Sequence, residues 1–177
     1  MYQASQLIFR EPQLTDALAI SDLVQSCPPL DVNSHYLSLL LCRDFHDTCV
    51  IAEHDSKVVG FLSAYHPPKQ ANTIFIWQAA VDSSLRSCGV ASRMLDALLS
   101  RLVDQDVNYL ETTITPSNQS SQKLFRSLAK RLKTECRTCG GFSSELFGEA
   151  NTHETEELYQ LGPFSLKPIY EEKQPIS

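Results

Sequence analysis

Two kinds of hydrophobic spacing alternate along this chain of 177 residues, one typical of strands and one typical of helices. In the first kind, β-branched and aromatic residues gather in short runs bounded by turn residues, which predicts strands. Asp55 and Ser56 separate two such runs and predict a tight hairpin. The predicted strands are residues 7–11, 48–54, 57–65, 73–81 and 107–115.

In the second kind, apolar residues recur three and four positions apart, which predicts helices. Thr15 and Asp16 supply chemistry typical of a helix start, and Asn33 or Ser34 is expected to cap the second helix. Further strands and an acidic loop at residues 145–157 are expected after Lys133. The predicted helices are residues 14–24, 35–45, about 89–104 and 118–132.

This order of elements predicts an α/β (α+β) fold with a mixed, mostly antiparallel sheet and helices on both faces. The chain length suits one domain, and neither a long linker nor an internal repeat divides it. We therefore expect a single domain over residues 1–177, with its core at about 7–165 and a flexible tail at 166–177.

Composition narrows the possible functions. The formal net charge of −6 argues against nucleic-acid binding, and no apolar run has the length of a membrane span. The first residues lack the pattern of a secretory signal, so we expect a cytoplasmic protein whose six cysteines stay reduced. Cys136 and Cys139 form a CxxC pair with no second pair, which does not indicate a metal site.

The turn after residues 73–81 carries the pattern Arg86-x-x-Gly89-x-Ala91 and leads directly into the longest apolar stripe. A helix that begins there presents unpaired N–H groups and the positive end of its dipole, which together bind anions. Gly89 allows close backbone approach, and Arg86 adds charge. Neither the Walker nor the Rossmann glycine pattern is present. The alternative is an ordinary turn with an exposed arginine.

This motif, followed by Asn118 at the start of the next helix, resembles the acetyl-CoA motif of the GNAT superfamily of N-acetyltransferases. Longer strings resemble, more narrowly, the diaminobutyrate acetyltransferase family of ectoine biosynthesis, which serves osmoprotection. These strings are 31-DVNSHYLSLLLCRDFHDTCVIAE-53, 75-FIWQAAV-81, 111-ETTITPSN-118 and 153-HETEELYQLGPF-164. The resemblance implies the GNAT fold, whose splayed strand pair holds acetyl-CoA, and it implies a homodimer.

The resemblance also assigns residues to acetyl-CoA. It implies that the backbone from Ala79 to Val81 pairs with the coenzyme and polarises the thioester carbonyl. It implies that Asn118 meets the pantetheine arm, although a plain helix cap is the alternative for this residue. The pyrophosphate would be surrounded by Arg86, Gly89 and Ala91. One departure is Phe125, which stands where many members have a tyrosine that protonates the thiolate.

For the substrate, the resemblance implies a small set of polar and aromatic residues. The alternatives are that Asp31 is a turn residue, that Trp77 lies in the core and that the acidic loop is merely solvated. The residues implied to bind substrate are Asp31, Tyr36, Trp77, His153 and Glu156. The residues implied to take part in catalysis are Ala79, Trp77 and Glu156.

The sequence thus predicts an enzyme that transfers acetyl from acetyl-CoA to the 4-amino group of L-2,4-diaminobutyrate by direct attack. No metal, nucleic acid or membrane is expected to take part. One alternative is an acetyltransferase for another small amine, such as ornithine or a polyamine. A second alternative is a non-catalytic acyl-CoA sensor, which would need the coenzyme motif but not the substrate residues.

Overall fold

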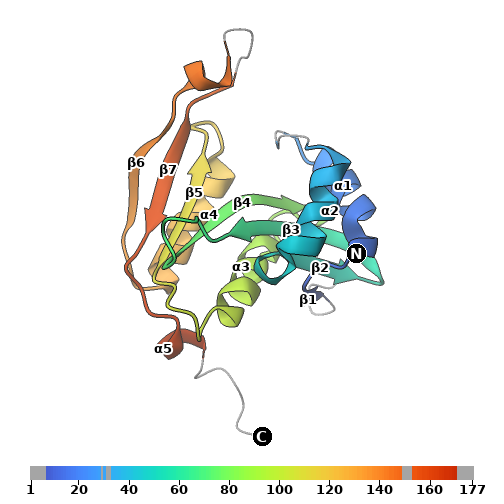
Figure 1. Ribbon diagram of the computed structural model, residues 1–177, viewed down its shortest axis with the longest axis horizontal. Coiled ribbons are helices and arrows are strands. Elements are labelled where there is room, and N and C mark those ends of the chain that lie inside the picture. The colour runs from blue at the N-terminus through green and yellow to red at the C-terminus, as the bar shows by residue number, and fades with distance from the viewer. Residues whose placement is uncertain (1–6, 29, 31–32, 149–152, 171–177) are drawn as a thin grey trace, which may run out of the picture. The chain divides into compact units, whose positions relative to one another are not determined.

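The computed structural model describes residues 7–28, 30, 33–148 and 153–170. Within them the chain forms a seven-stranded mixed sheet with the order β1-β2-β3-β4-β5-β7-β6 (Figure 1). The predicted fold class is confirmed. The strands are β1 Ile8–Arg10, β2 Val50–His54, β3 Lys57–Tyr65, β4 Thr73–Val81, β5 Tyr109–Ile114, β6 Cys136–Phe142 and β7 Glu156–Leu161. The helices are α1 Ala17–Gln25, α2 His35–Asp44, α3 Val90–Arg101, α4 Gln119–Arg131 and α5 Lys167–Tyr170.

The described chain forms two compact units, which are treated separately. The first comprises the described residues of Met1–Tyr65 and Trp77–Arg101, and the second those of His66–Ile76 and Leu102–Ser177. β4 contributes its first four residues to the second unit and its last five to the first. The expectation of a single domain stays a prediction.

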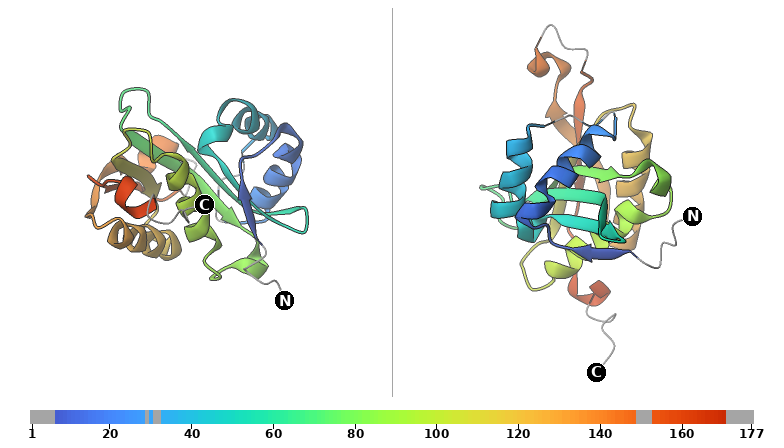
Figure 2. Two further views of the ribbon diagram at one scale, coloured as in Figure 1. Left: turned by 90° about the horizontal axis from the view of Figure 1, so that it is seen from below. Right: turned by 90° about the vertical axis from the view of Figure 1, so that its right-hand side faces the viewer.

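In the first unit, helices cover both faces of the β2–β3 hairpin. Ile51 and Phe61 pack with α1 and α2 in a buried apolar cluster, and Figure 2 shows these two helices on one side of the strands. On the other side, Gly60 lies against Met94 of α3 so closely that an added Cβ would be 3.1 Å from the methionine sulfur. The hairpin turn lies at Asp55 and Ser56, as the sequence predicts. Both residues have positive φ, which is the conformation that a two-residue hairpin turn requires.

An ion-pair cluster joins β1, β2 and the start of α1. Arg10 donates two hydrogen bonds to the Asp16 carboxylate, at 2.7 and 2.9 Å, and a third of 2.7 Å to Glu53. Asp16 also accepts from the Gln13 backbone at 2.7 Å, as predicted for a helix start. The hydrogen bonds from Arg10 lower the pKa of Asp16.

In the second unit, β5 pairs in parallel with the first four residues of β4, from Thr73 to Ile76. β7 pairs antiparallel with both β5 and β6, and Figure 1 shows the three strands side by side. α4 buries Phe125, Leu128 and Ala129 on its apolar face. This unit therefore contains β5, β6, β7 and the first half of β4, and it has its own buried side chains.

The structure corrects three details of the sequence prediction. α3 ends at Arg101 instead of near residue 104. Glu156 is the first residue of β7, so the predicted acidic loop ends before it. Leu166 is buried and precedes α5, so the packed chain extends past residue 165. No helix among the described residues is long and apolar enough to cross a membrane.

Candidate active site

The second half of β4 presents a surface with an exposed tryptophan. Burial alternates along the strand, so that Gln78 and Ala80 are buried whereas Trp77 is 46% exposed. The core interpretation of Trp77 is therefore wrong. The β4–β5 ladder ends at the pair Ile76–Thr112, and β4 then continues for five residues. Ala79 and Val81 lie in this continuation, where the sequence predicts contact with the coenzyme.

The turn after β4 is built by local hydrogen bonds. Asp82 accepts from the Ser84 backbone at 2.9 Å and from its hydroxyl at 2.5 Å, and these bonds lower the pKa of Asp82. The Asp82 backbone in turn donates to Val59 at 2.9 Å, which attaches the turn to β3. The short helical turn Ser83–Leu85 follows, with Leu85 buried. The start of α3 is therefore anchored at both the strand and the core.

Gly89 occupies the position where this turn enters α3. Its φ is +76°, a backbone conformation that glycine adopts without steric cost. A Cβ built on Gly89 would meet no atom within 4 Å, so the space above its backbone is open. Arg86 is exposed and Ala91 is half-buried. These features suit a phosphate group that approaches the backbone closely.

α3 has the length and burial that a strong helix dipole needs. It runs for twelve residues and buries Val90, Met94 and Leu98 among others. The first α-helical bond runs from the Arg93 N–H to the Gly89 carbonyl at 3.0 Å. A helix that begins in this way presents, in its first turn, N–H groups for which the helix itself supplies no acceptor. Anion binding at this turn stays a prediction, and the exposed Arg86 is the cation that the motif supplies for it.

In the second unit, Asn118 caps α4, since its side chain accepts a 3.1 Å hydrogen bond from Ser121 N–H. The cap interpretation is thus correct. The cap uses the oxygen of the amide, so the amide nitrogen remains a hydrogen-bond donor. The predicted pantetheine contact is compatible with the cap.

His153 and Glu156, two of the residues that the resemblance assigns to the substrate, lie close together. Nε2 of His153 is 3.8 Å from the Glu156 carboxylate, and both side chains are about four-fifths buried, with 18% and 19% exposed. Phe147 stacks on the imidazole with 4.0 Å between ring centroids and 15° between planes. The pair therefore offers an oriented ring nitrogen and a carboxylate that is largely shielded from water.

The remaining predicted substrate residues are not drawn together in the same way. Tyr36 lies in the first turn of α2 and is 65% exposed. Asp31 lies outside the described residues, so its predicted role stays a prediction. Phe125 is 4% exposed and belongs to the buried face of α4.

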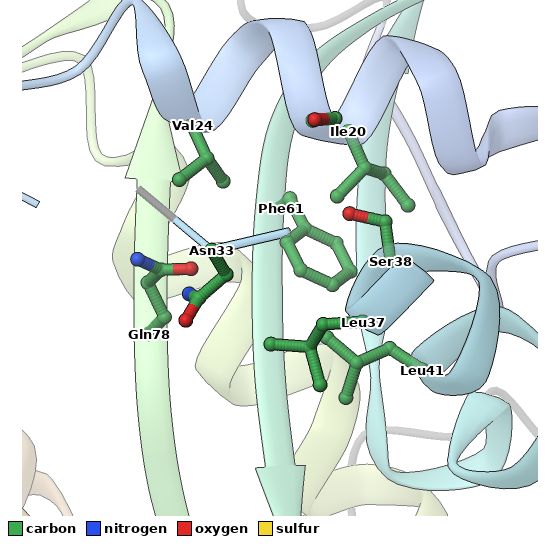
Figure 3. A pocket seen from close by; sticks show the side chains of 9 residues that line it. Ile20, Val24, Asn33, Leu37, Ser38, Leu41, Phe61 and Gln78 are labelled. Carbon is green, nitrogen blue, oxygen red and sulfur yellow. The ribbon is translucent and has the colours of Figure 1, made fainter. Parts of the chain in front are cut away.

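The sequence did not indicate a recess between α1, α2 and the strands of the first unit, whose mostly apolar lining includes two side-chain amides. It is small, about 10 Å³, and Figure 3 shows the amide groups of Asn33 and Gln78 pointing toward each other beside Phe61. Neither Trp77 nor Tyr36 lines this recess. A buried glutamine within the apolar pattern of β4 is the one signal that could have revealed it.

The sequence analysis also did not identify two further residues near the His153–Glu156 pair, Glu154 and Ser117. Glu154 accepts hydrogen bonds from the backbone N–H of Ser117, at 3.2 Å, and from its hydroxyl. The position of Ser117 directly before the capping Asn118 is a signal for Ser117, but nothing in the sequence pairs it with a residue 37 positions later.

The structure places the cysteines and shows the state of their thiols. Cys42 and Cys49 are buried free thiols, and burial raises their pKa to about 11 and about 12. Cys136 and Cys139 are free thiols in β6. In the part of the chain that the structure describes, no group of three His, Cys, Asp or Glu side chains is arranged to hold a metal ion.

Comparison with known proteins gives one family and a consistent set of relatives. The sequence profile of the Acetyltransferase (GNAT) family matches residues 17–130. An L-2,4-diaminobutyric acid acetyltransferase from Marinococcus halophilus is 42% identical over 90% of this chain and 91% of its own. One from Vibrio cholerae is 44% identical over 87% and 88%.

A solved structure is similar in both sequence and fold. It is a diaminobutyrate acetyltransferase from Paenibacillus lautus in complex with its substrate L-2,4-diaminobutyric acid and coenzyme A. The TM-score is 0.86, with 39% identity, 89% of this chain covered and 95% of that chain. The resemblance that the sequence indicates is confirmed.

Proposed function

This chain belongs to the acetyltransferase (GNAT) family, and from that premise we propose that it transfers an acetyl group from acetyl-CoA to the 4-amino group of L-2,4-diaminobutyrate. Relatives 42% and 44% identical over most of both chains bear the name of this activity. The product is N4-acetyl-L-2,4-diaminobutyrate, as in ectoine biosynthesis.

The observation that carries the proposal is the turn at Gly89. Open space above a positive-φ glycine, at the start of a twelve-residue helix, fits the pyrophosphate of acetyl-CoA. Arg86, Gly89 and Ala91 would surround this group, and Asn118 would donate to the pantetheine arm. Ala79 and Val81 would pair with the same arm through their backbone.

Acetyl-CoA supplies the acetyl group as an activated thioester. The backbone N–H groups from Ala79 to Val81 would stabilise the charge that develops on the carbonyl oxygen. The attacking amine must first lose a proton, because an ammonium nitrogen has no lone pair. Glu156 and His153 offer proton acceptors of two kinds, and Trp77 would form an apolar wall beside the thioester. The nitrogen–carbon bond then forms, the carbon–sulfur bond breaks, and the thiolate takes up a proton.

Diaminobutyrate carries two ammonium groups and one carboxylate at neutral pH. We propose that Asp31, Tyr36, His153 and Glu156 bind its amino-acid end, so that the distal amine is the group acetylated. Shielding of Glu156 to 19% exposure strengthens its attraction to an ammonium group. An enzyme for ornithine or a polyamine is the closest alternative, since those substrates also carry several amines.

We further propose that the enzyme acts as a homodimer in the cytoplasm. Six thiols suit a reducing compartment, and those in the structure are free.

β6 is the last strand in the sheet order and is exposed from Arg137 to Phe142. Such an edge is normally covered or paired. Light scattering on the purified protein is expected to give the mass of two chains, and the mass of one chain would contradict the dimer.

The activity is tested by following CoA release from acetyl-CoA in the presence of diaminobutyrate, ornithine or putrescine. We expect rapid release with diaminobutyrate only. Release that is faster with ornithine or putrescine would support the alternative enzyme. Binding of CoA without release by any of the three amines would support the acyl-CoA sensor.

A further inference from the structure

Glu154 lies between two parts of the second unit and contacts both. Its backbone carbonyl is 2.7 Å from Nδ1 of His153. Its carboxylate accepts both hydrogen bonds of Ser117, one from the backbone and one from the hydroxyl. One residue therefore connects the imidazole to the turn that begins α4.

The contact with His153 fixes the protonation pattern of the ring. A carbonyl oxygen only accepts hydrogen bonds, so Nδ1 of His153 must carry a hydrogen. In the neutral ring the lone pair then lies on Nε2, which is the nitrogen that faces Glu156 at 3.8 Å. Phe147 stacks on the face of the imidazole and so restricts its rotation. The ring is thus set to accept a proton, or a hydrogen bond, at Nε2.

The contact with Ser117 fixes where this ring sits relative to α4. Ser117 directly precedes Asn118, whose side chain caps the thirteen-residue helix. A carboxylate in front of a helix N-terminus is favoured by the unpaired N–H groups and by the helix dipole. Glu154 is exposed, so its position depends on these two hydrogen bonds more than on packing.

We propose that Glu154 is a positioning residue for catalysis: through Ser117 it anchors the His153 ring, with its Nε2 acceptor, to the N-terminal turn of α4. The proposal rests on the proposed function only in so far as His153 binds the amine and Asn118 meets the coenzyme. The geometric part stands on the described contacts alone.

The first test needs no substrate. Protein labelled with ¹⁵N in its histidines reports the tautomer of each ring, and the signal of His153 is identified by its loss in His153→Ala. We expect the Nδ1–H tautomer in the wild type and in Glu154→Gln, which keeps an acceptor for Ser117. Glu154→Ala is expected to show the mixed tautomers of an unconstrained imidazole. A Glu154→Ala signal equal to the wild type, or an Nε2–H tautomer in the wild type, would overturn the proposal.

The second test uses kinetics. Glu154→Ala is expected to raise the KM for diaminobutyrate about tenfold or more, the scale of one hydrogen bond to a charged group, with little change in the KM for acetyl-CoA. Glu154→Gln should restore most of this loss. Glu145→Ala, which removes another exposed carboxylate, from the short helical turn Ser144–Phe147, is the matched control and should resemble the wild type.

A double-mutant cycle with Ser117→Ala completes the design. Removing the Ser117 hydroxyl should make Glu154→Ala less harmful than it is alone, because the two side chains act on one contact. Strict additivity, or equal losses in Glu145→Ala and Glu154→Ala, would contradict the proposed role. If the wild type does not acetylate diaminobutyrate but the tautomer results hold, the proposed function fails and the positioning of His153 stands.

Discussion

At the scale of single residues, the turn at Gly89 shows how a few atoms decide what a helix start can bind. The missing side chain leaves the backbone open, and the positive φ keeps that backbone turned toward the space in front of α3. Any other residue would fill this space with a Cβ. The exposed Arg86 adds a positive charge to the same turn.

We predict that Gly89→Gln weakens acetyl-CoA binding by at least about tenfold while the protein stays folded, because the side chain occupies the phosphate position. Gly140→Gln is the matched control, since Gly140 also has a positive φ and open space around its Cβ position. Both variants carry similar backbone strain, but only the first should lose affinity in calorimetry. Equal affinities for acetyl-CoA in the two variants would show that the pyrophosphate does not bind at this turn.

Phe125 gives a second prediction at this scale. Phe125→Tyr adds a hydroxyl to a side chain that is only 4% exposed, on the buried face of α4. We expect the change in kcat to stay far below the scale of about 10²–10⁴-fold that positioned proton transfer gives. Steady-state kinetics with saturating acetyl-CoA measure it. A hundredfold gain would show that the thiolate needs a protein acid.

At the scale of elements, hydrophobic spacing predicted most helices and strands because their burial is local and periodic. β4 was predicted at its true bounds, and the Asp55–Ser56 turn was predicted from residue type. The predicted bounds of α3 were too long because Leu102 is buried after the helix has ended. β6 was harder to predict, since Gly140 and Gly141 interrupt any alternation.

The candidate site could be predicted only where its residues lie in one motif. The turn from Arg86 to Ala91 is such a motif, whereas His153 and Glu156 were expected to bind substrate only because of the family resemblance. Contacts made by sequence-distant residues, such as Glu154 with Ser117, leave no periodic signal. The same holds for the recess lined by Asn33 and Gln78. The family resemblance supplied residue roles that spacing alone does not.

The cluster of Arg10, Asp16 and Glu53 gives a prediction about pH. The pKa of Asp16 is lowered in the folded protein, chiefly by its hydrogen bonds from Arg10. This carboxylate therefore stabilises the fold at pH values above its ordinary pKa. Its contribution is lost as the pH falls through the lowered pKa of the folded protein. Asp16→Asn should lower the free energy of unfolding at pH 7 by about 1–3 kcal/mol.

Urea denaturation at a series of pH values tests this. The difference between wild type and Asp16→Asn should shrink below about pH 4, the ordinary aspartate value. Asp44→Asn is the control, because Asp44 pairs with Arg43 on the exposed surface, where ion pairs contribute little. A difference that stays constant from pH 7 to pH 3 would show that the charge of Asp16 is not what stabilises the fold.

At the scale of the whole molecule, function depends on separate affinities for coenzyme and amine. Glu156 belongs to the set proposed for the amine and has no role in the proposed coenzyme site. Glu156→Ala should therefore raise the KM for diaminobutyrate by about tenfold or more, the scale of a charged hydrogen bond, and leave the KM for acetyl-CoA nearly unchanged. Equal increases in both KM values in steady-state assays would place Glu156 outside the amine site.

The central claim is that the amino-acid end of the substrate is held and only the distal amine reaches the thioester. One methylene in a fitted pocket changes kcat/KM by about 10–200-fold, so diaminopropionate and ornithine should both be poor substrates. Displacement from the attack geometry by about 1 Å costs about a further hundredfold.

The most direct test is to assay the three homologues and to locate the acetyl group in each product by tandem mass spectrometry. We predict a clear preference for diaminobutyrate, with the acetyl group on N4. Acetylation mainly on N2, or equal kcat/KM across the three homologues, would contradict the account.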